Sequence, residues 1–168
     1  MNKGWWAAFW TLWGLLLLSW ILLLCGVAAV QSTCYDNPVA ALADVSGVHG
    51  FTNTLVCNNL YRLYWFIVAF LLVVLIGLAV SAATGGLIAS ALSWMAWMAV
   101  LSLLLILGGD AFLGLRDVAY AASGVWWSRA ATAAAGFILA AIFALGLTFL
   151  LGWRQRRGGG AGGGPMKV

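Results

Sequence analysis

The chain has 168 residues, of which 65% are hydrophobic and only 7% are charged, and its formal net charge is +4. An average soluble domain carries about 25% charged residues. This chain has too few polar side chains to cover the surface of a water-soluble fold, so the composition predicts an integral, multi-pass membrane protein. The positive charge does not indicate nucleic-acid binding, because no basic, aromatic-interleaved surface is present. Most of the cations instead lie at the two chain ends: Lys3, Arg154, Arg156, Arg157 and Lys167.

The first predicted membrane span covers residues 5–30, an apolar stretch interrupted only by Thr11 and Ser19. It exceeds the ~20 residues that a helix needs to cross a bilayer. A secretory signal peptide is the competing interpretation, because Ala28 to Gln31 resemble a cleavage site. A signal peptide has an apolar region of only roughly 7 to 15 residues and is seldom rich in Trp, so a retained span is favoured.

The longest polar segment, residues 31–59, is predicted to be the first outer loop, and residues 60–83 a second span. Residues 84–86, Thr-Gly-Gly, then permit a tight reversal of the chain. Aromatic rings crowd the beginning of the second span, where amphipathic side chains favour the headgroup layer: Tyr61, Tyr64 and Trp65.

A third span is predicted over residues 87–108 and is ended by a Gly-Gly-Asp run. Residues 109–129 form the second outer loop, which mixes charged with apolar side chains and is expected to lie along the membrane interface. The fourth span covers residues 130–153, and the basic, glycine-rich tail of residues 154–168 is expected to form no core. Residues 1–153 are therefore predicted to be one all-α domain, a bundle of four transmembrane helices.

The topology follows from the charges. Four spans place both termini on one side of the membrane, and the positive ends make that side cytoplasmic or its organellar equivalent. The acids support this orientation, because all of them fall in the two predicted outer loops: Asp36, Asp44, Asp110 and Asp117.

Two cysteines, Cys34 and Cys57, share the first outer loop, on the face predicted to be oxidising. A disulfide between them would stabilise the loop by about 3 kcal/mol on the chain-entropy model. A thiol redox centre is the competing interpretation, but the C-x-x-C motif of four-span disulfide-forming quinone reductases is absent. Cys25 lies inside the first span and is expected to be an apolar core or lipid-facing residue.

Catalytic and metal-binding patterns are not found, so no catalytic residue, no metal site and no enzymatic activity is predicted. The single histidine, His49, is expected to be solvated, with ligation of a metal or pigment in an assembly as the alternative. The span interiors hold no ionisable group, which disfavours a proton or ion pump. Five charges near the outer ends of the spans are expected either to reach the headgroups or to pair as Arg and Asp at the interface: Arg62, Asp110, Arg116, Asp117 and Arg129.

The fourth span carries small residues at four-residue steps along one side, which lets another helix approach closely. This helix-packing set is Gly136, Ala140 and Ala144, extended by Ala131, Ala135 and Gly152. Its partner is expected to be either a helix of the same bundle or a helix of another subunit. Trp94 and Trp97 lie deeper than an interfacial belt and are expected to fill the bundle, or alternatively to contact a bound pigment or lipid. No other cofactor is predicted.

Four spans with cytoplasmic ends, two cysteines in the first outer loop, a short inner turn and a second outer loop together resemble the MARVEL and claudin-like tetraspan membrane proteins. The claudin signature of a Trp, a Gly-Leu-Trp and two closely spaced Cys does not occur, so no residue receives a role from this resemblance. It implies a role in membrane organisation or junction-like assembly. The expected partners are therefore membrane lipids and other transmembrane subunits, or further copies of this chain.

A second hypothesis is an accessory subunit of a large respiratory, photosynthetic or channel complex. Co-purification with a fixed set of larger subunits would favour that role. Homo-oligomers would favour the tetraspan scaffold, and a transporter or membrane enzyme is the least favoured of the three classes.

Overall fold

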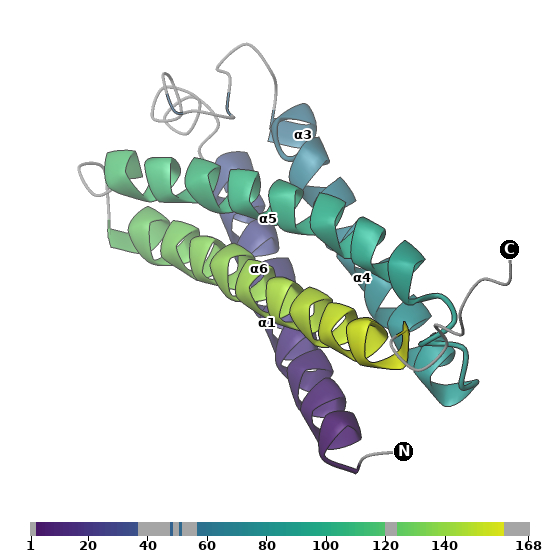
Figure 1. The fold of residues 1–168 in the computed structure, drawn as a ribbon. Helices are drawn as coiled ribbons and strands as arrows, with labels where there is room; N and C mark the ends of the chain where they lie inside the picture. Colours follow the sequence, from purple (N-terminus) through teal and green to yellow (C-terminus); the bar gives the residue numbers. More distant parts are fainter. Residues whose placement is uncertain (1–2, 37–47, 49–50, 52–56, 120–123, 160–168) are drawn as a thin grey trace, which may run out of the picture.

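The computed structural model describes residues 3–36, 48, 51, 57–119 and 124–159, and almost all of these are helical (Figure 1). The elements are α1 (Lys3–Asp36), the short α3 (Cys57–Leu60), α4 (Arg62–Ala83), α5 (Ala91–Ala119) and α6 (Gly124–Gly159). Within this described part, four helices are long and apolar enough to cross a membrane. For the described residues, the expected all-helical fold with four helices able to span a membrane is therefore confirmed. His49, most of the first loop and the end of the tail lie outside the described residues.

The helices differ in length relative to a bilayer. At ~1.5 Å per residue, the 22 residues of α4 match a hydrocarbon layer of ~30 Å. The other three are longer, with 34 residues in α1, 29 in α5 and 36 in α6. Figure 1 shows α5 and α6 running side by side, with α1 crossing α6 obliquely. A helix longer than the hydrocarbon layer is generally accommodated by tilting, by kinking or by local thickening of the bilayer.

Several helix boundaries differ from those expected, and α6 also continues past residue 153 to Gly159, into the predicted tail. The first span was expected to end at residue 30, but α1 continues to Asp36 and takes Cys34 with it. The second outer loop was expected at residues 109–129, but α5 continues through Gly108 and Gly109 to Ala119, and α6 begins at Gly124. A glycine inside a helix costs about 1 kcal/mol relative to alanine. Here that cost is offset, because the missing side chain of Gly108 lets the ring of Phe137 lie directly against α5.

Helix α6 is the centre of the bundle. It packs extensively against both α5 and α1, whereas α4 makes smaller contacts with α1 and α5. The start of α1 and the end of α6 lie at the same end of the bundle, which we call the terminal end (Figure 1). The Arg154 guanidinium stands 5.1 Å from the centroid of the Trp5 ring, which joins these two helix ends directly. We call the opposite end, where α4 and α6 begin, the loop end.

The reversal between α4 and α5 forms as expected. Thr84 ends α4 and donates its backbone N–H to the carbonyl of Val80. Gly85 follows with a φ of 75°, in the left-handed region that a side chain disfavours. A glycine at this position therefore lets α5 return alongside α4 after a short turn.

Candidate functional site

The predicted helix-packing residues lie inside this chain's own bundle. Gly136, Ala140 and Ala144 are all buried on α6. A methyl group added to Gly136 would lie 2.6 Å from the backbone nitrogen of Leu23, and one added to Gly26 would lie 2.5 Å from the Cα of Ala133. We call this antiparallel contact the α1–α6 seam. Of the other small residues, Ala135 is exposed, so the small-residue side is narrower than the sequence pattern suggested.

The α1–α6 seam extends from Trp5 and Arg154 near the terminal end to Thr33 and Arg129 near the loop end. Leu12 approaches Gly146 near the terminal end, at 3.5 Å from the position of an added methyl group. At the loop end, the Arg129 guanidinium on α6 donates to the hydroxyl of Thr33 and lies 3.4 Å from the carbonyl oxygen of Ala29 on α1. A hydrogen bond with a charged donor is stronger than one between neutral groups. Arg129 therefore joins α6 to α1 at the loop end of the seam. One interpretation of the sequence had expected it to pair with an Asp, and no such ion pair is present among the described residues.

Tryptophan side chains join α1 to α4. The indole N–H of Trp13 donates to the carbonyl oxygen of Leu75, and that of Trp20 to the carbonyl oxygen of Val68, each at 3.0 Å. A third bond joins the Trp65 indole to the side-chain oxygen of Gln31. An indole N–H buried in lipid needs an acceptor. Trp13 and Trp20 are seven residues apart on α1, and the acceptor residues Leu75 and Val68 are seven apart on the antiparallel α4, so each donor lies opposite a carbonyl. Sequence reasoning missed this set, although the seven-residue spacing of Trp13 and Trp20 was its signal.

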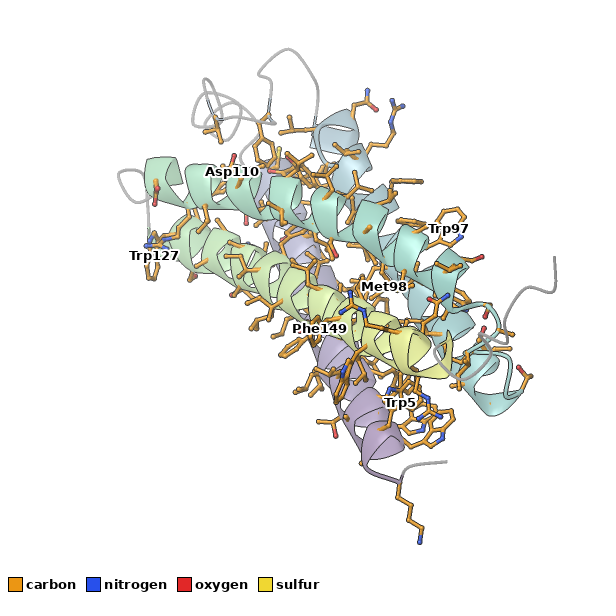
Figure 2. All side chains as sticks on the ribbon, in the orientation of Figure 1. Trp5, Trp97, Met98, Asp110, Trp127 and Phe149 are labelled. Carbon is orange, nitrogen blue, oxygen red and sulfur yellow. The ribbon has the colours of Figure 1, made fainter. Side chains whose placement is uncertain are left out.

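The other tryptophans that the sequence singled out have separate environments. Trp94 is half-buried, donates to the Ser81 hydroxyl at 3.0 Å and lies against Gly77, so it fills the contact between α4 and α5. Trp97 is 53% exposed and touches Phe70 edge-on, with 5.6 Å between ring centroids. Figure 2 shows Trp97 projecting outward from α5.

The remaining predicted charges lie on the surface at the loop end. Arg116 and Asp117 stand 3.9 Å apart on α5 with exposed side chains, too far for a hydrogen bond. The Arg116 guanidinium also lies 5.5 Å from the Trp127 ring centroid on α6. Arg62 and Asp110 are exposed as well, but neither forms an ion pair or a side-chain hydrogen bond within the described part of the chain.

Asp110 lines a groove between α4 and α5 with a cavity volume of about 210 Å³. We call it the α4–α5 groove. Its walls are Leu63, Tyr64 and Ile67 from α4, with Leu104, Leu107, Gly108, Asp110 and Ala111 from α5. The walls are apolar except for the Tyr64 hydroxyl and the Asp110 carboxylate. An apolar groove with a few convergent polar groups is the usual character of a binding site.

A cluster of aromatic rings supports the groove from inside the bundle. Tyr64 meets Phe112 at 4.9 Å between ring centroids, and Phe112 stacks on Phe137 at 5.3 Å. Phe51, from the first loop, completes the cluster at 5.2 Å from Tyr64. Tyr61 lies beside Phe51, fully buried, and its hydroxyl has no partner among the described residues. Burial, and secondarily the nearby Tyr64, raise the pKa of Tyr61 well above its usual range, so this hydroxyl keeps its proton.

The cysteines are placed unequally. Cys34 is completely buried in the last turns of α1 and is not a free thiol. Cys57 begins α3, which contacts α1, but its side chain lies outside the described residues. Cys25 is exposed on α1 and free. Within the described residues, His, Cys, Asp and Glu side chains form no group of three that would suit a metal ion.

Comparison of the chain with models of protein families, with curated proteins and with solved structures finds no match.

Proposed function

We propose that this chain is a non-catalytic, multi-pass membrane protein that acts in membrane organisation or assembly, and that it does so by associating with further copies of itself. The α1–α6 seam is occupied within one chain, so association requires another surface. The surface that the geometry favours is the outward side of α4 and α5, which we call the α4–α5 face. Its exposed members include Arg62, Phe66 and Val73 of α4 and Leu103, Leu107 and Asp110 of α5.

The α4–α5 face presents ordered aromatic side chains beside the groove. Phe66, which is 58% exposed, stacks on Phe70 with 6.0 Å between ring centroids, and Phe70 contacts Trp97 of the neighbouring helix. Aromatic side chains that already pack on one another lose little conformational entropy when a second protein surface binds to them. Lipid tails provide no hydrophobic driving force for helix association, so a shaped surface of this kind has to gain its affinity from packing and polar contacts.

The observation that carries the proposal is the pair of opposite charges on this face. The contact between Tyr64 and Phe112 shows which parts of α4 and α5 lie at the same level along the bundle. Arg62 lies two residues before Tyr64, and Asp110 lies two residues before Phe112. Because α4 and α5 are antiparallel, the two charges differ in height by only about four residues, or roughly 6 Å. A long Arg side chain spans this difference. The two charges are not paired with each other within the chain.

A two-fold axis through the face would place Arg62 of each copy against Asp110 of the other. Such an isologous contact uses the same patch twice, and every charge on it finds a partner. The ion pairs would lie near the hydrocarbon boundary, where water is scarce and Coulomb attraction is stronger than in bulk solvent. The resemblance to tetraspan proteins supports the same proposal. The basic terminal end is proposed to face the cytoplasm or its organellar equivalent, because Lys and Arg collect on that side.

The test is a charge exchange. Asp110→Arg alone and Arg62→Asp alone should each weaken self-association in detergent or nanodiscs by about tenfold or more, because like charges then face each other. The double variant should restore it, measured by intact-assembly mass spectrometry and by in-membrane cross-linking. Asp117→Arg is the matched control, since Asp117 is exposed and pairs only weakly with Arg116, and it should associate like the unaltered chain. Failure of the double variant to recover would reject this interface.

The accessory-subunit hypothesis predicts a different result in the same experiment. A foreign helix with a basic residue at the same height would occupy the α4–α5 groove and pair with Asp110. Asp110→Arg would then release a fixed set of other subunits, and the charge exchange within this chain would rescue nothing.

A further inference from the structure

Asp110 has no cationic partner within the single chain, whether or not copies associate. Its side chain is exposed and forms no ion pair or hydrogen bond among the described residues. Two of the described cations at the loop end are engaged elsewhere, since Arg116 lies beside Trp127 and Arg129 donates to Thr33. A carboxylate close to hydrocarbon is costly without a counter-charge. A cationic group supplied from outside the protein would remove this cost.

The α4–α5 groove leads from this carboxylate toward the middle of the bundle. Leu104 lines the groove six residues before Asp110 on α5, which places it about 9 Å further from the loop end along the helix axis. On the opposite wall, Ile67 lies about 6 Å further from the loop end than Leu63. Figure 2 shows Asp110 toward the loop end of α5. The groove therefore joins a carboxylate near its loop end to an apolar interior.

The groove is narrow and open at its side. Its cavity volume of about 210 Å³ is smaller than the ~300–1,000 Å³ of pockets for drug-sized ligands, which favours a single hydrocarbon chain over a fused ring system. Leu63 and Leu107 are 56% and 59% exposed, whereas Ile67 and Ala111 are buried and lie at the base of the groove. An acyl chain of the surrounding lipid can therefore enter from the side.

We infer that the α4–α5 groove binds phosphatidylethanolamine from the leaflet at the loop end. The primary ammonium of the headgroup donates to the Asp110 carboxylate, and one acyl chain lies in the groove. Charge complementarity selects this headgroup, because hydrogen bonds between an ionised donor and a carboxylate are strong. A choline headgroup carries the same charge but has no N–H to donate, and Asp110 repels an anionic headgroup. A single chain forms this site. Where copies associate as proposed above, the lipid competes with Arg62 of the second copy for the same carboxylate.

The experiment uses the full chain in vesicles of equal parts phosphatidylethanolamine and phosphatidylcholine with identical acyl chains. Native mass spectrometry counts the lipids retained on the monomer. The unaltered chain should retain phosphatidylethanolamine over phosphatidylcholine by about fivefold or more. Asp110→Asn keeps the shape of the side chain but removes its charge, and it should lose this preference. Asp117→Asn is the matched control, because it removes an exposed acid from the same helix outside the groove, and it should keep the preference.

A lipid with two N-methyl groups separates hydrogen bonding from headgroup size. N,N-dimethyl phosphatidylethanolamine is nearly as bulky as phosphatidylcholine but keeps one N–H, so it should still be retained over phosphatidylcholine. Equal retention of these two lipids would show selection by size and overturn the contact with Asp110. A preference for phosphatidylethanolamine that survives Asp110→Asn would overturn it as well.

A second pair of variants tests the position of the acyl chain. Leu107→Trp enlarges a wall of the groove and should lower the total lipid retained. Leu103→Trp should not, because Leu103 is also 59% exposed but does not line the groove. Equal effects of the two variants would place the chain outside the groove and overturn the site. If the monomer shows no lipid preference while the charge exchange of Arg62 and Asp110 restores association, this inference fails and the proposed function stands.

Discussion

Replacing Gly136 by alanine tests the closest approach in the bundle. The added methyl group would lie 2.6 Å from the backbone nitrogen and 2.7 Å from the Cα of Leu23. Carbon atoms in favourable contact are ~3.5–4.0 Å apart, and backbone atoms inside a helix cannot rotate away. Helices α1 and α6 would have to separate by about 1 Å, at an overpacking cost of ~1–3 kcal/mol. The higher helix propensity of alanine offsets at most about 1 kcal/mol of this.

Gly14 on α1 offers a matched control, because no atom lies within 4 Å of the methyl group that alanine would add there. Gly14→Ala is expected to unfold like the unaltered chain or slightly later, and Gly136→Ala to be less stable than Gly14→Ala by ~1–3 kcal/mol. Gly26→Ala should resemble Gly136→Ala, since its methyl group would lie 2.5 Å from the Cα of Ala133.

The measurement is equilibrium unfolding in a mild detergent titrated with a denaturing one and followed by circular dichroism. Gly136→Leu extends the series, since a larger side chain should prevent the native seam from forming. Leucine at Phe149, which is 76% exposed, should be tolerated. If Gly136→Ala and Gly14→Ala were equally stable, the two backbones could not approach as closely as described, and the seam would not be the basis of the bundle's stability.

Three further predictions concern other parts of the chain. Trp13→Phe should lower the free energy of unfolding by ~0.5–1.5 kcal/mol through loss of the bond to the Leu75 carbonyl, whereas Trp10→Phe, at an exposed ring, should change it much less. Cys34 and Cys57 are expected to form a disulfide across α1 and α3, so peptide mapping without reduction should recover them linked; recovery of both as alkylated thiols would contradict this. Labels attached to the two termini should be accessible from the same, cytoplasmic side of sealed vesicles, and accessibility from opposite sides would require an odd number of spans.

The helical spans were predictable because composition alone imposes them. A stretch of ~20 apolar residues in lipid must satisfy its own backbone hydrogen bonds, and a helix does so within the segment. The second span, expected at residues 60–83, matches α4 at Arg62–Ala83 closely, because a polar loop precedes it and a glycine turn follows. The turn itself was predictable from Gly85, whose positive φ is a local property.

The ends of α1 and α5 were not predictable from local rules. The Gly-Gly-Asp run after Leu107 reads as a helix stop in isolation, yet α5 passes through it, because the ring of Phe137 occupies the space that Gly108 leaves. Similarly, α1 extends past Val30 to a turn where Thr33 receives the Arg129 guanidinium. In both places a residue distant in sequence supplies the contact that keeps the helix intact.

The candidate sites divide in the same way. Arg62 and Asp110 could be singled out as charges near span ends, but only the tertiary structure placed them on one face beside the α4–α5 groove. The small-residue side of the fourth span indicated a close helix contact, but not whether its partner would come from the same chain.

The sequence by itself determined that this chain belongs in a lipid environment and forms four long helices, since hydropathy and backbone hydrogen bonding act within each segment. Only the tertiary structure decided which helices meet and which surfaces stay open. In lipid, no hydrophobic force favours one apolar helix face over another, so which helices pack together depends on their shape. The missing side chain of Gly136 lets the backbone of Leu23 approach, and that of Gly108 lets the ring of Phe137 approach. Close approach at those two glycines makes α6 the centre of the bundle, and the outward side of α4 and α5 stays exposed.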